Sequence, residues 1–166
     1  MGNVIGIVAE YNPFHNGHAR LIEQTRAQLG AACPVVCVMS GDFVQRGSPA
    51  VYSKFARAEA AVRSGADLVL ELPLPWSLSS AEGFARGAVG LLGSLGVVTH
   101  LSFGSECGEL EPLQRVAEAL LDPLLGEDLG LLAGLRGPAG STAGELRRPR
   151  RGDDLRPPER PRGAIK

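Results

Sequence analysis

The chain has 166 residues, of which 44% are hydrophobic and 21% are charged, and its formal net charge is −1. These values are typical of one globular domain with a sizeable core. The most apolar stretch, residues 88–98, is too short and too rich in glycine to span a bilayer, and the first residues lack the basic segment of a signal peptide. Three cysteines do not indicate a disulfide framework, so we expect a cytoplasmic protein in which Cys33 and Cys37 are buried free thiols.

Strand and helix patterns alternate along the chain. Strands are predicted over residues 3–9, 34–39, 67–72 and 97–103. Helices are predicted over residues 16–30, 52–64, 80–95 and 111–121, with a shorter helix running on to about 135. This order predicts an α/β fold with a doubly wound parallel sheet. In the strand order 3-2-1-4, the turns after the first and fourth strands meet at the switch point, where ligands bind.

The turn after the first strand carries a candidate anion site. Two histidines, His15 and His18, bracket Gly17 where a helical pattern begins. A helix start presents unpaired N–H groups and the positive end of the helix dipole, and a glycine allows an anion to approach the backbone. Both histidines lie on one side of the first turn, so both can donate to one phosphate.

Further blocks follow this motif in a fixed order. Glu-Tyr-Asn-Pro-Phe-His-Asn-Gly-His at 10–18 is followed by Met-Ser-Gly-Asp-Phe-Val-Gln-Arg-Gly at 39–47, Gly-Ala-Asp-Leu-Val-Leu-Glu-Leu-Pro at 65–73 and Leu-Ser-Phe-Gly-Ser-Glu at 101–106. His-x-Gly-His after a first strand is the signature of the nucleotidylyltransferase superfamily, with its Rossmann-like fold. The four blocks together resemble the bacterial tRNA(Met) cytidine acetate ligase family, over roughly residues 4–125.

The resemblance implies an enzyme that uses ATP, with Mg²⁺, to convert acetate to acetyl-adenylate. It then acetylates the wobble cytidine of elongator tRNA(Met) to N4-acetylcytidine. Two alternatives stay open: a coenzyme-forming adenylyltransferase, and an ATP-binding remnant that does not acetylate tRNA. The family's proteins are longer and continue through a second domain, so we expect an ATP-binding domain over 1–135 and a chain truncated or frameshifted after about residue 135.

The resemblance and the turn chemistry give the candidate site residues. His15 and His18 are the expected catalytic residues, because both histidines hold the α-phosphate in this superfamily. The expected nucleotide-binding residues are Ile7, Val8, Ala9, Glu10, Tyr11, Asn12, Pro13, Phe14, His15, Asn16, Gly17, His18, Ala19, Arg20 and Gly104. The expected substrate-binding residues are Ser40, Gly41, Asp42, Arg46 and Lys54.

Several of these residues have a structural alternative. The segment 40–42 also suits a tight turn. Lys54 and Arg57 are either pyrophosphate cations or part of a solvated helix face, and Gly6 either lets the backbone run near the nucleotide or packs under a helix. Glu106 either orients a magnesium-bound water or caps a turn. No set of metal ligands is assigned to the protein itself. Gly83, Gly87 and Gly90 share one helix face, where we expect close packing of helix on sheet.

The charge is divided unevenly along the chain. Residues 1–140 hold nine Lys/Arg and fourteen Asp/Glu, whereas residues 141–166 hold eight and four. An acidic body is a poor RNA surface, because RNA affinity depends on neutralising phosphates. Residues 136–166 are rich in Pro, Arg and Gly and contain no aromatic residue. They are predicted to be a disordered tail, with a basic arm touching nucleic acid as the alternative.

Overall fold

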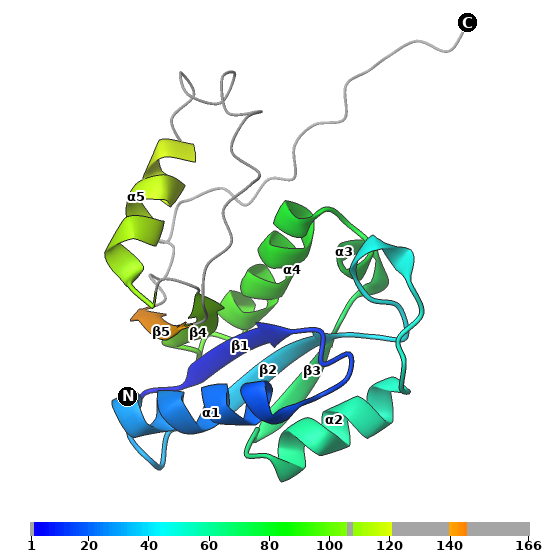
Figure 1. Ribbon diagram of the computed structural model, residues 1–166, viewed down its shortest axis with the longest axis horizontal. Coiled ribbons are helices and arrows are strands. Elements are labelled where there is room, and N and C mark those ends of the chain that lie inside the picture. The colour runs from blue at the N-terminus through cyan, green and yellow to red at the C-terminus, as the bar shows by residue number, and fades with distance from the viewer. Residues whose placement is uncertain (1, 106–107, 121–139, 146–166) are drawn as a thin grey trace, which may run out of the picture.

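The computed structural model describes residues 2–105, 108–120 and 140–145. Helices and strands alternate along most of this length (Figure 1). The elements are β1 (Ile5–Ala9), α1 (Asn16–Leu29), β2 (Val35–Ser40), the 3-10 turn η1 (Gln45–Gly47), α2 (Lys54–Arg63), β3 (Leu68–Leu72), α3 (Leu74–Ser77), α4 (Ala81–Ser94), β4 (His100–Ser105), α5 (Leu110–Leu120) and β5 (Gly140–Glu145).

The strands form one sheet in the order β3-β2-β1-β4-β5. Strands β1 to β4 are mutually parallel, and β1 lies between β2 and β4. The doubly wound sheet and the order 3-2-1-4 predicted from the sequence are therefore confirmed. The carboxyl ends of β1 and β4 are neighbours, so the turns that follow them share one edge of the sheet.

The structure adds three elements that the sequence did not predict, namely β5, α3 and the 3-10 turn η1. Strand β5 pairs antiparallel with β4, covering an edge that would otherwise present unpaired N–H and C=O groups. It lies in the segment predicted to lack structure, and for residues 140–145 that expectation is wrong. The rest of that segment, the short helix towards residue 135 and Glu106 lie outside the described residues. Helix α3 is a single turn that begins directly after the predicted third strand, with Pro73 at its N-cap and Pro75 within it, because proline is tolerated in a first helical turn.

Two apolar cores lie on opposite faces of the sheet. One core packs α1 and α2 against Ile5, Ile7 and Cys37, and the other packs α4 against Val36 and Val38. Cys33 and Cys37 are buried free thiols, as predicted. Among the described residues, no helix is long and apolar enough to cross a membrane.

The structure decides between the two interpretations of Gly6 and corrects the prediction for the glycines of α4. A β-carbon at Gly6 would stand 2.9 Å from Leu92 Cδ1 and 3.0 Å from Val98 Cγ1, so Gly6 packs under α4 and does not serve a close approach to a nucleotide. On α4, Gly87 packs against the indole of Trp76 on α3, and Gly90 has nothing within 4 Å of its would-be β-carbon. The face of α4 that carries these glycines therefore packs against the preceding segment of chain, at Trp76, and not against the sheet.

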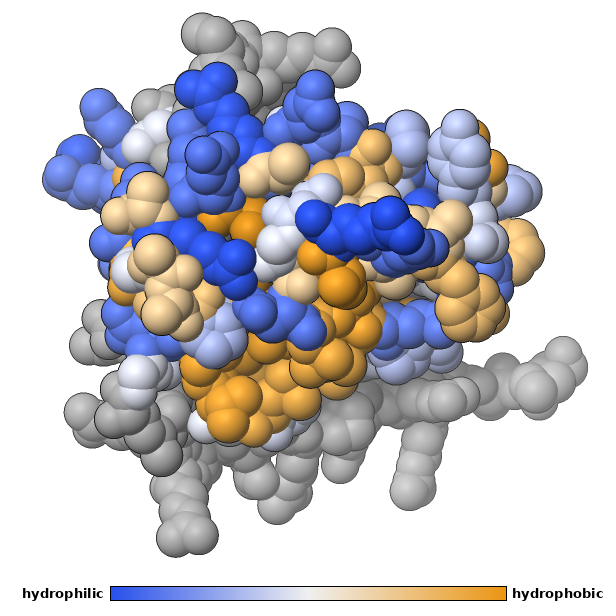
Figure 2. All heavy atoms as spheres, turned by 90° about the horizontal axis from the view of Figure 1, so that it is seen from below, coloured by the Kyte–Doolittle hydropathy of each residue, from blue (hydrophilic) through white to orange (hydrophobic). Residues whose placement is uncertain are grey.

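Seen from below, the surface carries a hydrophobic area bordered by hydrophilic side chains (Figure 2). Large apolar side chains that stay exposed include Val62 of α2 and Leu68 of the edge strand β3. Leu68 is the first residue of β3, so it lies at the opposite end of the parallel strands from the edge at which β1 and β4 finish. Leu68 is therefore remote from the carboxyl ends of β1 and β4.

Candidate functional site

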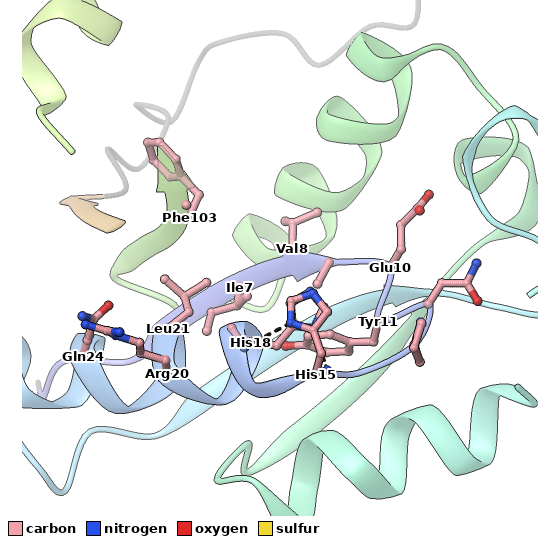
Figure 3. Close-up of a pocket in the computed structure, with 15 residues that line it drawn as sticks. Ile7, Val8, Glu10, Tyr11, His15, His18, Arg20, Leu21, Gln24 and Phe103 are labelled. Atoms are coloured by element: carbon pink, nitrogen blue, oxygen red, sulfur yellow. Dashed lines mark hydrogen bonds between the residues drawn. The ribbon is translucent and has the colours of Figure 1, made fainter. Parts of the chain in front are cut away.

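A cleft of about 880 Å³ opens at the carboxyl ends of β1 and β4, beside the first turns of α1 (Figure 3). It brings together most of the predicted nucleotide-binding residues. Those that line it are Ile7, Val8, Ala9, Glu10, Tyr11, Asn12, Pro13, His15, Gly17, His18, Arg20 and Gly104. Phe14, Asn16 and Ala19 were also predicted but are not lining residues, whereas Leu21, Gln24 and Phe103 line the cleft and were not predicted.

His15 and His18 cap the start of α1 reciprocally. The Nδ1 atom of His15 accepts the Gly17 N–H at 3.1 Å, and the Nδ1 atom of His18 accepts the His15 N–H at 3.2 Å. This is the geometry of a capping box, with imidazole nitrogens replacing the usual oxygen acceptors. A β-carbon at Gly17 would stand 2.9 Å from His15 Cε1, so the glycine is needed for the His15 ring to fold over the helix start.

These bonds fix the tautomer of both rings. A neutral imidazole that accepts through Nδ1 carries its proton on Nε2. The rings stack with centroids 3.7 Å apart and both residues line the cleft, so each ring keeps an Nε2–H donor that its cap does not use. Burial, together with the neighbouring His15, lowers the pKa of His18 to about 4 from an ordinary value of 6.5. His18 is therefore a neutral hydrogen-bond donor at physiological pH.

Tyr11 packs against His18 from the core side of the cleft. Its side chain is buried, and its hydroxyl donates to Cys37 Sγ of β2 at 3.2 Å. Its ring lies 4.9 Å from those of Phe14 and His18, in an edge-on arrangement with His18. Tyr11 thus contributes a wall of the cleft, whereas its hydroxyl is engaged in the core.

The turn between β1 and α1 is tied to the segment that follows β2. Glu10 Oε1 accepts the Gln45 N–H at 2.7 Å, and Asn12 Oδ1 accepts the Val51 N–H at 2.7 Å. Because both side chains are engaged in this way, they fix the backbone of the turn that leads to His15.

The five predicted substrate-binding residues form no part of the cleft lining. Ser40 is fully buried, and its hydroxyl has no hydrogen-bond partner among the described residues. Lys54 Nζ lies 2.8 Å from Glu71 Oε2 and 3.7 Å from Asp42 Oδ2, so two carboxylates compensate its charge, and hydrogen bonding to Glu71 raises its pKa. Arg46 is exposed and adopts a left-handed backbone with φ of 72°.

Arg57 is neither a phosphate cation nor part of a solvated helix face, which corrects both sequence interpretations. Its side chain is 1% exposed. The guanidinium donates to the carbonyl oxygens of Tyr52, Glu10 and Gly41. Burial lowers the pKa of Arg57, and the carboxylates of Asp42 and Glu10 act in the opposite direction. Local sequence gave no signal for this role, because two of the three carbonyls, those of Glu10 and Gly41, belong to residues 47 and 16 positions away along the chain.

The cleft lining suits a metal that arrives with its ligand better than one bound by the protein alone. Glu10 contributes the only carboxylate among the lining residues, and no cluster of three or more His, Cys, Asp or Glu that would hold a metal ion occurs in the described parts of the chain. Mg²⁺ commonly takes one or two carboxylates and fills its other positions with substrate phosphates and water. Glu10 Oε1 accepts the Gln45 N–H, so such a metal would meet this carboxylate only through Oε2.

The comparisons with known proteins agree with this architecture. The chain is 54% identical to the tRNA(Met) cytidine acetate ligase of Clostridium acetobutylicum over 120 residues, which are 72% of this chain and 30% of that protein. The enzyme of the same name from Syntrophomonas wolfei is 56% identical over 117 residues, or 70% of this chain and 28% of the relative. The chain thus spans less than a third of the length of these curated relatives.

A solved structure, Thermotoga maritima TmcAL bound with alpha-thio ATP, is 52% identical and superposes with a TM-score of 0.68 over 71% of this chain and 28% of that one. The sequence model described as HIGH Nucleotidyl Transferase matches residues 2–124. These residues include β1 to β4 and both cleft histidines. The chain therefore belongs to the HIGH nucleotidyl transferase family.

Proposed function

We propose that the cleft binds ATP, with His15 and His18 donating to its α-phosphate, and that this chain carries the acetate-activating part of a tRNA(Met) cytidine acetate ligase. The observation that carries the proposal is the reciprocal cap of the two histidines. It directs both Nδ1 atoms at the backbone and leaves two stacked Nε2–H donors for the ligand. Support also comes from the relatives of that name and from the ATP analogue bound to the Thermotoga protein.

The proposed first step joins acetate to the nucleotide. An acetate oxygen attacks the α-phosphorus, the bond from that phosphorus to the bridging oxygen of pyrophosphate breaks, and acetyl-adenylate forms. Negative charge on the α-phosphate oxygens and the leaving pyrophosphate is stabilised by hydrogen bonds from the two Nε2–H groups. Because His18 stays neutral, it acts by donating a hydrogen bond and positioning the phosphate, without losing or gaining a proton.

The proposed second step consumes the adenylate. The N4 amine of the wobble cytidine attacks the acetyl carbonyl carbon, the bond from that carbon to the phosphate oxygen of AMP breaks, and N4 loses a proton. Ser40, Gly41, Asp42, Arg46 and Lys54 remain proposed contacts for the acyl group, the triphosphate or the tRNA. Arg46 is the more accessible of the two cations, because Lys54 already pairs with Glu71.

Calorimetric titration with ATP tests the first part of the proposal. A chain in which His15 and His18 are both alanine loses two hydrogen bonds to a charged group, so its affinity is expected to fall at least tenfold. The matched control is His100→Ala. His100 is the third histidine of the chain, and it begins β4, so it lies at the amino-terminal end of the strands, away from the cleft. Unchanged ATP affinity in the double variant would refute the site.

Pyrophosphate exchange tests the acyl substrate. Radiolabelled pyrophosphate is expected to enter ATP when acetate is present. Exchange that requires nicotinamide mononucleotide or phosphopantetheine, and does not occur with acetate, would instead establish a coenzyme-forming adenylyltransferase.

A further inference from the structure

A single buried guanidinium connects two loops at the carboxyl edge of the sheet. Arg57 Nε donates to the Tyr52 carbonyl at 3.1 Å, Nη1 donates to the Glu10 carbonyl at 2.6 Å, and Nη2 donates to the Gly41 carbonyl. Glu10 lies in the turn that precedes the histidines, whereas Gly41 and Tyr52 bound the segment between β2 and α2. One guanidinium nitrogen thus holds the turn before the histidines, and the other two hold the two ends of the segment between β2 and α2.

Two side chains of the same turn reinforce this connection. The Glu10 carboxylate accepts the Gln45 N–H, and the Asn12 side chain accepts the Val51 N–H. Residues 10–13, which we call the histidine turn, therefore bond directly to Gln45 and Val51 of segment 41–52, and Arg57 links the turn to both ends of that segment. The segment is itself closed, because Ala50 N–H donates to the Asp42 carbonyl at 2.9 Å.

We propose that Arg57 is a positioning residue that holds the histidine turn against segment 41–52, so that nucleotide binding at His15 and His18 and the ordering of this segment are coupled. The inference rests on the proposed function for its ATP step. Arg57 touches neither histidine and does not line the cleft, so it acts through the backbone of Glu10.

The chemistry of the guanidinium explains why arginine occupies this position. Its five N–H donors lie in a fixed plane and reach acceptors in several directions, whereas the ammonium of lysine is a single point. Arg57→Lys keeps the positive charge, but the lysine ammonium cannot donate a hydrogen bond to all three carbonyl oxygens. The remaining carbonyls become buried acceptors without a donor, and the histidine turn loses its fixed relation to segment 41–52.

The test compares Arg57→Lys with Arg63→Lys, a matched change on the same helix. The Arg63 side chain is 77% exposed and pairs with Glu59, one turn earlier on the surface of α2. We expect Arg57→Lys to fold and to bind ATP about tenfold more weakly in calorimetry, and Arg63→Lys to bind like the unmodified chain. Equal ATP affinity in a folded Arg57→Lys variant would overturn the inference.

A double-mutant cycle separates positioning from a purely structural effect. If Arg57 acts through the histidines, then Arg57→Lys has little further effect on ATP affinity once His15 and His18 are alanine. Effects that add in full would show that Arg57 acts elsewhere and would overturn the inference. Wild-type affinity in the histidine variant would instead refute the proposed ATP site.

Amide hydrogen exchange provides readouts that do not depend on the variant binding ATP. Without nucleotide, the Gln45 and Val51 amides are expected to exchange at least several-fold faster in Arg57→Lys than in Arg63→Lys. Unchanged exchange would overturn the coupling even if ATP is not the ligand. If Arg57→Lys does not fold, exchange is measured in the unmodified chain with and without ATP. ATP is expected to slow exchange of the Gln45 and Val51 amides, and exchange that ATP does not slow would contradict the coupling.

Discussion

The indole of Trp76 fills the space in which a β-carbon at Gly87 would stand. That β-carbon would lie 2.4 Å from Trp76 Cγ, whereas one at Gly90, a turn further along α4, would meet nothing within 4 Å. The glycine at position 87 thereby allows α3 to pack directly on α4, and this contact holds the segment after β3 close to the sheet.

Gly87→Ala is expected to destabilise the chain by about 1–3 kcal/mol, because overpacking displaces the indole. Gly90→Ala is the matched control and is expected to stabilise by up to about 1 kcal/mol, because alanine is the better helix former. Urea unfolding followed by the fluorescence of Trp76, the only tryptophan, measures both. Equal stability of the two variants would contradict the contact.

The low pKa of His18 predicts a loss of stability in mild acid. The imidazole has a pKa of about 4 in the folded chain and an ordinary value of 6.5 when unfolded. As the pH falls, the unfolded state therefore binds the proton first. The contribution of His18 to the free energy of unfolding is fully present above pH 6.5 and is lost as the pH drops towards 4. Between pH 7.5 and pH 5 this group is expected to cost on the order of 1–2 kcal/mol, allowing for solvent screening.

Urea unfolding at pH 7.5 and pH 5 measures this effect, with His18→Gln as the comparison. Glutamine keeps an acceptor for the His15 N–H and does not titrate, so the acid-induced loss should be smaller by that amount. An identical loss in both chains would mean that His18 titrates normally in the folded state.

The sequence predicted the parts of the fold that depend on local pattern. The run of apolar residues in β1, followed at once by the start of α1, places His15 and His18 at the sheet edge, and topology alone brings Gly104 opposite them. The first strand and helix were predicted well because hydrophobic periodicity and the motif coincide there. The fourth strand was predicted at 97–103 but begins at His100, because the ladder with β1 starts there, after the Thr99 and His100 N–H groups have both donated to the Val4 carbonyl.

The features that the sequence did not reveal depend on contacts between distant residues. Arg57 sits in a helix that looks amphipathic, so its charge suggested solvent, whereas its acceptors are carbonyls as far as 47 residues away along the chain. Leu21 lines the cleft from α1 but follows the first motif, and Phe103 lines it from β4 within the fourth block, where only its neighbour Gly104 was predicted. No local pattern distinguishes a buried cation or a cleft wall from an ordinary helix or strand position.

Cys37 is expected to resist alkylation in the folded chain. Burial raises its pKa to about 11, although the hydrogen bond from Tyr11 opposes the shift. At pH 8 roughly one thiol in a thousand is then ionised, and the thiolate is the reactive form. Mass spectrometry after iodoacetamide treatment should find Cys37 unmodified in buffer and modified in urea. Equal modification in the two conditions would show that the thiol is open to solvent.

Binding of tRNA by this 166-residue chain is expected to depend on its last residues and to be non-specific. Residues 1–140 carry nine basic and fourteen acidic residues, whereas residues 141–166 carry eight basic residues, and these include Arg147, Arg148, Arg150 and Arg151. Contacts with phosphates alone release counterions and carry no sequence information, so affinity should fall steeply as salt rises.

Filter binding at several salt concentrations, with elongator tRNA(Met) and an unrelated tRNA, tests this expectation. A chain shortened to end at Glu145 should lose nearly all binding, and replacing the four arginines with glutamine should reduce the salt dependence by several phosphate contacts. Retained binding by the shortened chain, with preference for elongator tRNA(Met) at physiological salt, would show that the acidic body itself carries a specific RNA surface. Segment 41–52, with Arg46 exposed at its centre, would then be the first place to seek it.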